Sequence, residues 1–302
     1  MKEKKRVLIV DDIEDDVEYC IESLANDPQH EWEALSTDNG KDALNIIRVN
    51  RFDCMLLDYS LPALNGIEVL QQLRENNIEL PVIMLTGQGS ERIAVESMKY
   101  GAQDYLTKDE IKYPNIVNVM LQGIERKKRE LTIFQRANYD HLTGLAGRAL
   151  YQDRINSAIE RCLRLDSHFM LIFLDLDKFK GVNDVHGHKA GDLMLKEVAV
   201  RLESCVRKSD TVARLGGDEY AIIVENIDSK NSRSIEKLLT KIHSAITSQP
   251  IYYKNVSLDF NASIGAAIYP DSAKTCDELE ALADKAMYKS KQDCEKKFNY
   301  IR

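Results

Sequence analysis

Gly216-Gly217-Asp218-Glu219-Tyr220 lies between two apolar runs, Thr211–Leu215 and Tyr220–Val224. Two adjacent glycines in this position predict a two-residue β-hairpin turn, because both turn residues can adopt φ > 0. The two carboxylates that follow are not needed for the turn. Neighbouring strand residues normally point to opposite faces, so a kinked turn can aim both acids at one site. A solvated surface turn is the alternative for this pentapeptide taken by itself.

A second acidic segment follows an apolar run upstream of the predicted hairpin. The run Leu171–Leu174 leads into Asp175-Leu176-Asp177-Lys178-Phe179-Lys180, and Asn183 and Gly191-Asp192 come next. The two-residue period of a strand puts Asp175 and Asp177 on the same side of its end. Two carboxylates on one side of a strand end suit the binding of a divalent cation.

Together these segments resemble the GGDEF family of diguanylate cyclases, which condense two GTP molecules into cyclic di-GMP. The resemblance covers roughly Asn138 to Arg302 and includes Asp140-His141-Leu142-Thr143-Gly144-Leu145 and Asn261-Ala262-Ser263-Ile264-Gly265. It implies an α/β, nucleotidyl-cyclase-like domain with a mainly antiparallel sheet over residues 139–302.

The resemblance also implies roles for individual residues. Asp175, Asp218 and the backbone carbonyl of Leu176 would coordinate Mg²⁺, with two ions in each site that stabilise in-line displacement of pyrophosphate. Glu219 would be either a metal ligand or the general base for the attacking 3′-hydroxyl, and the sequence leaves both roles open. Lys291 would contact the triphosphate.

The family's substrate contacts fall on four further residues. Phe179 and Lys180 would lie on a short loop whose backbone N–H groups hold phosphate. Asn183 and Asp192 would bind the guanine edge, and a carboxylate at 192 favours guanine because adenine has no matching pair of donors. The chain departs from the family after Lys291: Cys294-Glu295 stands where the family has glycine and a basic residue, followed by Lys296 and Lys297.

Arg207-Lys208-Ser209-Asp210 lies just before the predicted hairpin, at the family's position for a product-inhibition site. An arginine can stack on a guanine and hydrogen-bond it in a fork, and Asp210 can accept from the guanine edge. The resemblance therefore implies that Arg207 and Asp210 bind cyclic di-GMP. The tetrapeptide pattern alone is weak, because it arises often by chance.

The first part of the chain alternates short apolar runs with helical periodicity. This alternation predicts a doubly wound, five-stranded parallel sheet. Its candidate strands are Val7–Val10, Trp32–Ser36, Cys54–Leu57, Val82–Leu85 and Asp104–Leu106. Because sites in such sheets form at the carboxyl ends of strands, polar residues that follow these strands should converge.

This region resembles the receiver domain of two-component response regulators, a flavodoxin-like fold. By position, Asp58 would be the phosphorylated aspartate, and one Mg²⁺ would be held by Asp11, Asp12 and Asp58. Lys108 would bind the phosphoryl group, while Thr86 and Tyr105 would form the conformational switch. The resemblance implies a cognate histidine kinase as the phosphodonor.

A long helix is predicted between the two regions. Val117, Met120, Ile124, Lys127, Leu131, Phe134 and Asn138 recur at alternating spacings of three and four residues. This heptad-like pattern predicts a coiled coil with a second copy of the chain, and a helix packed on its own domain is the alternative. The expected organisation is a receiver over 1–113, a helical linker over 114–138 and a cyclase domain over 139–302.

Composition bounds the remaining possibilities. The 302 residues suit two domains, and a net charge of −8 argues against nucleic-acid binding, which needs a basic face. The six cysteines show no C-x-x-C pair, which favours reduced thiols in a cytoplasmic protein. The amino terminus fits neither a signal peptide nor a membrane span.

The sequence therefore predicts a phosphorylation-regulated diguanylate cyclase. It would act as a homodimer on GTP, release cyclic di-GMP and be inhibited by that product. The alternative is a catalytically inactive GGDEF module that senses GTP or cyclic di-GMP.

Overall fold

The structure of the protein is a computed structural model that describes residues 2–87, 91–293 and 298–302. The chain divides into two compact units, Met1–Ile133 and Phe134–Arg302. Each unit has its own hydrophobic core, built around its own five-stranded sheet. The two units are therefore described one at a time.

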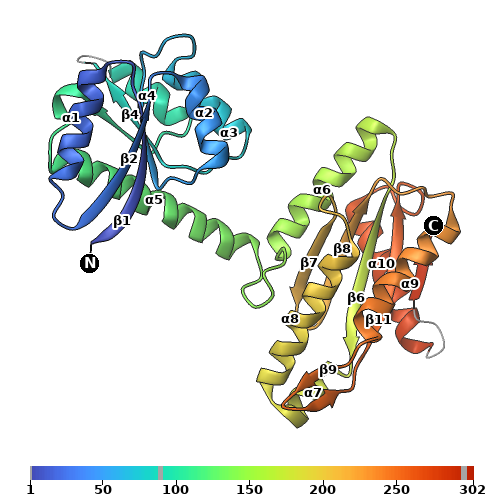
Figure 1. Ribbon diagram of the computed structural model, residues 1–302. Coiled ribbons are helices and arrows are strands. Elements are labelled where there is room, and N and C mark those ends of the chain that lie inside the picture. The colour runs from blue at the N-terminus through green and yellow to red at the C-terminus, as the bar shows by residue number, and fades with distance from the viewer. Residues whose placement is uncertain (1, 88–90, 294–297) are drawn as a thin grey trace. The chain divides into compact units, whose positions relative to one another are not determined.

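The first unit is built on an all-parallel sheet with the strand order β2-β1-β3-β4-β5. Its strands are β1 (Glu3–Val10), β2 (His30–Thr37), β3 (Cys54–Asp58), β4 (Val82–Thr86) and β5 (Asp104–Thr107). Its helices are α1 (Glu14–Ala25), α2 (Gly40–Val49), α3 (Gly66–Glu75), α4 (Glu91–Lys99), the 3₁₀ turn η1 (Lys108–Glu110) and α5 (Asn115–Asn138). Every strand predicted from the sequence is present, and the doubly wound fold is confirmed (Figure 1).

Helices on both faces of this sheet explain its apolar central strands. Every residue of β3 and β4 is buried. One hydrophobic cluster joins the sheet to α2 and α3, and another joins it to α1 and α5. A parallel strand covered on both faces reads as a continuous apolar run, which is the pattern that the sequence showed.

Helix α5 is continuous over the range predicted for the linker, but its first turns form part of the core of the first unit. Ile116, Val117 and Met120 are buried in the cluster that also contains β1, β3 and α1 residues. A Cβ on Gly123 would lie 2.8 Å from Cδ1 of Ile83, so the helix passes close to the sheet there. Two positions of the predicted seam, Val117 and Met120, are therefore covered by the first unit itself.

The far end of α5 differs from its beginning. Lys127 forms an ion pair with Glu79, whereas Ile133 and Phe134 are 67% and 54% exposed. Residues 134–138 of the helix belong to the second unit. The apolar side chains that a second copy could cover thus lie in the last turns of the helix.

The second unit is built on a mixed, mainly antiparallel sheet with the order β12-β11-β6-β8-β7, in which only β11 and β12 pair in parallel. Its strands are β6 (Phe169–Asp177), β7 (Thr211–Gly216), β8 (Glu219–Glu225), β11 (Asn261–Tyr269) and β12 (Phe298–Ile301), with a separate hairpin of β9 (Ile251–Tyr253) and β10 (Val256–Leu258). Its helices are α6 (Arg148–Leu165), α7 (Phe179–His186), α8 (His188–Cys205), α9 (Ser232–Thr247) and α10 (Cys276–Gln292). The predicted mainly antiparallel sheet is confirmed.

The two faces of this sheet carry separate cores. One cluster packs the sheet against α8 and α9, and the other packs it against α6 and α10. Along β6 the side chains of Met170, Ile172, Leu174 and Leu176 lie in the first cluster, so Asp175 and Asp177 lie on the α6/α10 side. The two acids share one face, as the strand period predicted.

Helix α10 rests directly on β11. A Cβ on Gly265 would lie 1.9 Å from the backbone nitrogen of Met287 and 2.3 Å from the carbonyl oxygen of Ala283. Only glycine permits this approach. Lys291 follows Met287 by one helical turn, so the glycine contact also sets how close Lys291 comes to the sheet.

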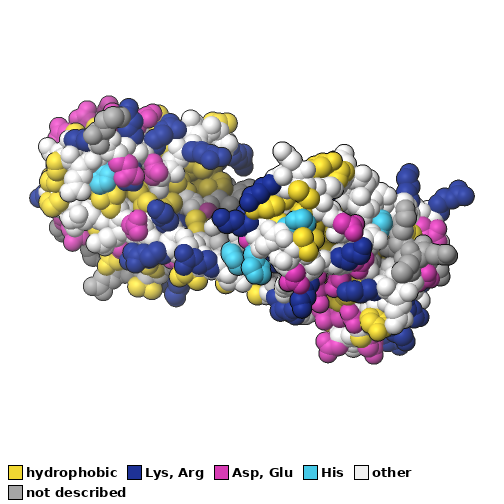
Figure 2. Space-filling view, turned by 90° about the horizontal axis from the view of Figure 1, so that it is seen from below, with side chains coloured by type: hydrophobic (Ala, Val, Ile, Leu, Met, Phe, Trp, Pro, Cys, Tyr) yellow, Lys and Arg dark blue, Asp and Glu magenta, His cyan; other side chains and the backbone are white. Residues whose placement is uncertain are grey.

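Within the described residues, none of the helices combines the length and the apolar character needed to cross a membrane. On the face shown in Figure 2, charged side chains of both signs are interspersed with hydrophobic ones.

Candidate functional site

The hairpin that carries the two glycines is displaced by one residue from its predicted position. Gly216 pairs with Glu219, so the two turn residues are Gly217 and Asp218. A bulge between Arg214 and Gly216 shifts the register. Gly216 and Gly217 have φ values of +150° and +53°, which suit glycine. As a result Asp218 lies in the turn itself, and Glu219 is the first residue of β8.

The three predicted acids meet at the end of the sheet. Asp175 of β6 pairs with Glu219 of β8, and the backbone N–H of Leu176 donates to the carbonyl oxygen of Asp218 at 3.3 Å. Burial and then the charge of Asp175 raise the pKa of Asp218 above its ordinary value. Neighbouring carboxylates that repel each other are stabilised by a cation, and hard oxygen donors fit Mg²⁺.

A lysine lies beside this acidic group. Nζ of Lys291 is 2.7 Å from Oδ1 of Asp175, and this hydrogen bond raises the pKa of the lysine. The neighbouring acid Asp177 instead accepts from Oγ of Ser263 at 2.8 Å. The structure thus brings Lys291 to the acids, where its charge offsets part of theirs. Glu295, Lys296 and Lys297, which bear on the departure from the family, lie outside the described residues.

The segment expected to hold phosphate is helical and is not the predicted loop. Phe179 and Lys180 form the first turn of α7, after Lys178 in a left-handed conformation with φ of +65°. The first N–H groups of a helix have no partner within the helix and favour anions. Phe179 is partly buried against the core, whereas Lys180 is exposed. The main-chain donors expected of a loop are therefore supplied by a helix start.

Asn183 has a buried oxygen that no described residue satisfies. Its Oδ1 is buried without a hydrogen-bond partner. A Cβ on Gly191 would lie 2.1 Å from this oxygen, so the glycine of α8 leaves room for the amide. Asp192 follows Gly191 and is exposed. A buried acceptor without a donor costs free energy, and a bound ligand with an N–H group would satisfy it.

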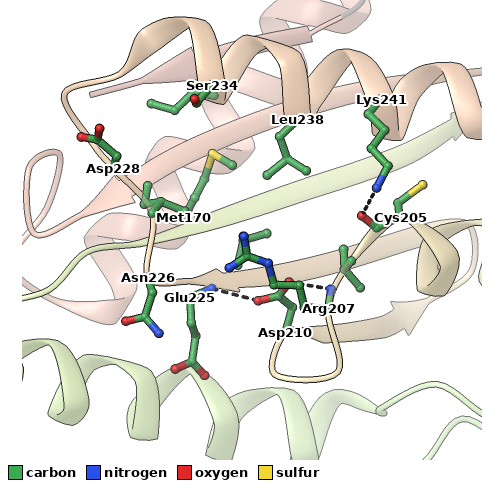
Figure 3. A pocket seen from close by; sticks show the side chains of 14 residues that line it. Met170, Cys205, Arg207, Asp210, Glu225, Asn226, Asp228, Ser234, Leu238 and Lys241 are labelled. Atoms are coloured by element: carbon green, nitrogen blue, oxygen red, sulfur yellow. Dashed lines mark hydrogen bonds between the residues drawn. The ribbon is translucent and has the colours of Figure 1, made fainter.

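Arg207 and Asp210 line a pocket of about 430 Å³ between the 207–210 turn, the end of β8 and α9. The carboxylate of Asp210 accepts from the backbone N–H groups of Arg207 at 2.8 Å and Glu225 at 3.2 Å (Figure 3). This carboxylate therefore holds the turn in place. The guanidinium of Arg207 forms no hydrogen bond with the other described residues, so it is available to bind a ligand.

A second cation lines the same pocket. Lys241 of α9 donates from Nζ to the carbonyl oxygen of Cys205 at 2.8 Å (Figure 3). Its partner is a neutral carbonyl oxygen, whereas Glu225 on the pocket wall is neutralised by Arg161 at 2.5 and 3.0 Å. The pocket thus has two cations that suit an anionic ligand.

The polar residues after the receiver strands converge at one edge of the first sheet. Ligand oxygens of Asp11, Asp12 and Asp58 lie within 4.8 Å of one another, a spacing that suits one divalent cation. Nζ of Lys108 lies 2.9 Å from Asp11 and 3.4 Å from Asp58. Burial and then the charge of Asp11 raise the pKa of Asp58.

The two predicted switch residues have opposite exposures. Thr86 is buried, and its Oγ1 lies 3.5 Å from the carbonyl oxygen of Leu106, while Tyr105 is 41% exposed. Thr86 ends β4 and pairs with Thr107 of β5, whereas Tyr105 pairs with Met84, two residues before that end.

Three residues of these sites were missed from the sequence. Asp16 of α1 contacts Lys108, Lys241 lines the pocket that contains Arg207, and Arg214 donates to the carbonyl oxygen of Gly217 in the hairpin turn. The sequence weakly indicated that Asp16 lies near the acidic site, because Asp16 follows Asp12 by one helical turn at the start of a helix. Nothing in the sequence indicated Lys241, since its partner Cys205 is distant in sequence, or Arg214, since a side-chain hydrogen bond to a nearby backbone carbonyl leaves no sequence pattern.

The diguanylate cyclase GGDEF domain model matches residues 137–297, more than half of the chain, and the receiver-domain model of response regulators matches residues 7–119. The chain is 42% identical over 175 residues to the bifunctional diguanylate cyclase and cyclic di-GMP phosphodiesterase MucR of Pseudomonas aeruginosa, covering 58% of this chain and 24% of that protein. It is 32% identical over 173 residues to the diguanylate cyclase DgcS of Shewanella oneidensis, covering 57% of this chain and 56% of that protein. The chain therefore spans about a quarter of the length of MucR and 56% of the length of DgcS.

Among solved structures, the GGDEF domain of DgcB from Caulobacter crescentus, in complex with c-di-GMP, is similar with a TM-score of 0.50 and 27% identity. That similarity covers 54% of this chain and 95% of the DgcB domain. Both the matched residues and the fold coincide with the second unit. The chain belongs to the GGDEF family, with a response-regulator receiver domain ahead of its GGDEF domain.

Proposed function

We propose that this protein is a diguanylate cyclase that condenses two GTP molecules into cyclic di-GMP and two pyrophosphates. The observation that carries the proposal is the meeting of Asp175, Asp218 and Glu219 at one sheet end. A degenerate, nucleotide-sensing relative would be expected to lack acids of this group. The intact acids therefore favour catalysis over sensing alone.

Each bond-forming step is an in-line displacement at phosphorus. The 3′-oxygen of one GTP forms a bond to the α-phosphorus of the other. The bond between that phosphorus and the oxygen that links it to the β-phosphorus breaks, and this oxygen leaves with pyrophosphate. When bound, Mg²⁺ neutralises charge on the phosphates, and Asp175, Asp218 and the carbonyl of Leu176 would hold it. Glu219 is placed to act beside it, as a ligand or as the acceptor of the 3′-hydroxyl proton.

The substrate is positioned by α7, α8 and α10. Asn183 offers its unsatisfied oxygen to a guanine donor, and Asp192 accepts from the N1–H and the exocyclic amine. The N-terminal turn of α7, with Phe179 and Lys180, faces phosphate with unpaired N–H groups. Lys291 can leave Asp175 for a phosphate oxygen once a cation balances the acids.

The active form is a homodimer, because each GGDEF domain holds one GTP and the product needs two. Each 3′-hydroxyl must reach the α-phosphorus held by the partner. The exposed Ile133 and Phe134 at the end of α5 are side chains that a second copy can cover. Dimer geometry is then the variable that regulation changes.

Phosphorylation of Asp58 by a histidine kinase is the proposed activating signal. One Mg²⁺ at Asp11, Asp12 and Asp58, together with Lys108, would offset the charge of the phosphoryl group. Thr86 and Tyr105 would report the change to the neighbouring surface. Cyclic di-GMP at Arg207 and Asp210 would oppose activity, since a ligand that favours one state shifts the equilibrium toward it.

The proposal is tested with purified protein, GTP and Mg²⁺, with and without beryllofluoride as a mimic of phosphoaspartate. We expect cyclic di-GMP in both conditions and faster formation with the mimic. Asp218→Ala should abolish turnover, and Asp58→Asn should keep basal turnover but lose the response to the mimic. Binding of GTP or cyclic di-GMP without any product in either condition would instead identify a nucleotide sensor.

A further inference from the structure

Lys108 of the receiver is shared among three acids that come from three different elements. Its Nζ lies 2.7 Å from Asp16, 2.9 Å from Asp11 and 3.4 Å from Asp58. The shortest contact is with Asp16, in the first turn of α1. The longest is with the residue proposed to accept the phosphoryl group.

Asp16 differs from the other acids in its place at this edge. The side chains of Asp11 and Asp58 are 0% and 3% exposed, whereas that of Asp16 is 28% exposed. The group of oxygens close enough to share a cation consists of Asp11, Asp12 and Asp58. Asp16 therefore contacts the lysine from the rim of the site.

Lysine is protonated at neutral pH, so Lys108 carries a full positive charge. Its shortest contact is with Asp16 and not with the proposed phosphoacceptor.

We propose that Asp16 is a positioning residue that competes with Asp58 for Lys108 and thereby opposes phosphorylation of the receiver. The inference rests on the proposed phosphoacceptor role of Asp58. In the reaction, an oxygen of Asp58 forms a bond to phosphorus while the bond between phosphorus and the leaving group of the phosphodonor breaks, and the leaving group keeps the electron pair. The new phosphoryl group carries negative charge that needs Lys108.

Two effects of Asp16 act in the same direction. Any movement of Lys108 toward a phosphoryl oxygen that lengthens its contact with Asp16 costs part of a partly exposed ion pair. The charge of Asp16 also repels the phosphoryl group. Removing the charge at position 16 should therefore favour the phosphorylated state by roughly three- to tenfold.

The experiment uses the full chain and the matched pair Asp16→Asn and Asp15→Asn. Asp15 is the exposed neighbour in the same first turn of α1, so both variants remove one negative charge from the same helix end. At saturating Mg²⁺ we would measure beryllofluoride affinity by titration calorimetry and the rate of phosphorylation by acetyl phosphate. We expect Asp16→Asn to raise both by roughly three- to tenfold and Asp15→Asn to leave both unchanged.

Any one of four results would overturn the inference. Equal effects of the two substitutions would show that only net charge at the helix end matters. Weaker beryllofluoride binding in Asp16→Asn would show that Asp16 supports the site. A loss of Mg²⁺ affinity larger in Asp16→Asn than in Asp15→Asn, measured without beryllofluoride, would assign Asp16 to the cation. If the unsubstituted chain bound no beryllofluoride, the phosphoacceptor role itself would fall, and the inference with it.

Discussion

Arg214 joins Asp140 to the catalytic turn. Its guanidinium donates to both carboxylate oxygens of Asp140, at 2.9 and 3.0 Å, and to the carbonyl oxygen of Gly217, at 3.0 and 2.7 Å. Asp140 also accepts from the backbone N–H and the hydroxyl of Thr143. The turn that follows α5 is therefore tied to the residue directly before Asp218.

These hydrogen bonds predict the effect of replacing the guanidinium of Arg214. Arg214→Lys keeps the charge but cannot bond Asp140 and Gly217 together in a fixed plane. We expect cyclic di-GMP formation to fall by roughly tenfold or more, with kcat affected more than KM, because misplacement of a reacting group costs rate. Initial rates over a range of GTP concentrations would measure both. Arg148→Lys is the control, since among the described residues Arg148 donates one hydrogen bond, to the carbonyl oxygen of Leu215 at 3.1 Å. Equal turnover in the two variants would contradict the prediction.

The close approach of α10 to β11 predicts an effect at Gly265. Gly265→Ala places a methyl group against the backbone of Met287 and should lower the free energy of unfolding by about 1–3 kcal/mol. The displaced helix should also move Lys291 away from Asp175 and reduce turnover. Urea denaturation followed by circular dichroism checks the stability. Gly181→Ala is the control, because a Cβ there meets nothing within 4 Å, and it should be neutral or slightly stabilising. Wild-type stability in Gly265→Ala would show that α10 can move without cost.

The proposed binding of cyclic di-GMP in the pocket of Arg207 and Asp210 predicts a role for Lys241. Lys241→Ala should weaken cyclic di-GMP binding by roughly three- to tenfold, because the pocket then has one cation fewer for an anionic ligand. Lys237→Ala removes a lysine one turn earlier on the same helix, outside the pocket lining, and should have no effect. Titration calorimetry with cyclic di-GMP compares the two. Arg207→Ala should weaken binding further and relieve product inhibition. Unchanged cyclic di-GMP binding in Arg207→Ala would show that the product binds elsewhere. Equal affinities of Lys241→Ala and Lys237→Ala would exclude a role for Lys241 alone.

A buried carboxylate predicts part of the acid sensitivity of the receiver. Asp27 is 3% exposed, and although burial raises its pKa, hydrogen bonds from Gln29, Trp32 and His30 lower the pKa to about 2. A lowered folded-state pKa contributes stability above the unfolded value, near 4, and that contribution is lost as the pH falls toward 2. The contribution at neutral pH is about 2 kcal/mol.

The measurement is the free energy of unfolding of the receiver unit in the full chain between pH 7 and pH 2, followed through Trp32. Asp27→Asn should be less stable at pH 7 and should lose less stability on acidification. Parallel pH curves for the two proteins would mean that Asp27 does not carry this dependence.

Local patterns determined the elements and much of both sites. Fully apolar runs predicted β3 and β4, because a strand covered on both faces must be apolar throughout. Alternation at the end of β6 predicted the shared face of Asp175 and Asp177. Adjacent glycines predicted the hairpin, since few other residues adopt φ > 0 there. These inferences needed only neighbours in the chain.

The register and the long-range contacts were decided by the tertiary structure. The bulge after Arg214 places Asp218 in the turn. The register of the hairpin depends on the pairing of β8 with both β7 and β6, which local sequence does not specify. The heptad-like seam of α5 predicted a partner helix, but the receiver sheet buries Val117 and Met120 first. A heptad-like pattern predicts that one face of a helix is buried, but it does not identify the element that buries it.

The sequence by itself therefore determined the strands of the first sheet, the hairpin of β7 and β8 and the acids that end β3 and β6, because these depend on nearest neighbours and on the periods of the backbone. It did not predict that Phe179 and Lys180 begin a helix. Only the tertiary structure decided that Lys108 contacts Asp16 most closely and that Lys241 joins Arg207 in one pocket. Those pairs meet because separate elements pack on the same sheet, and the choice of packing partner is a property of the whole folded unit.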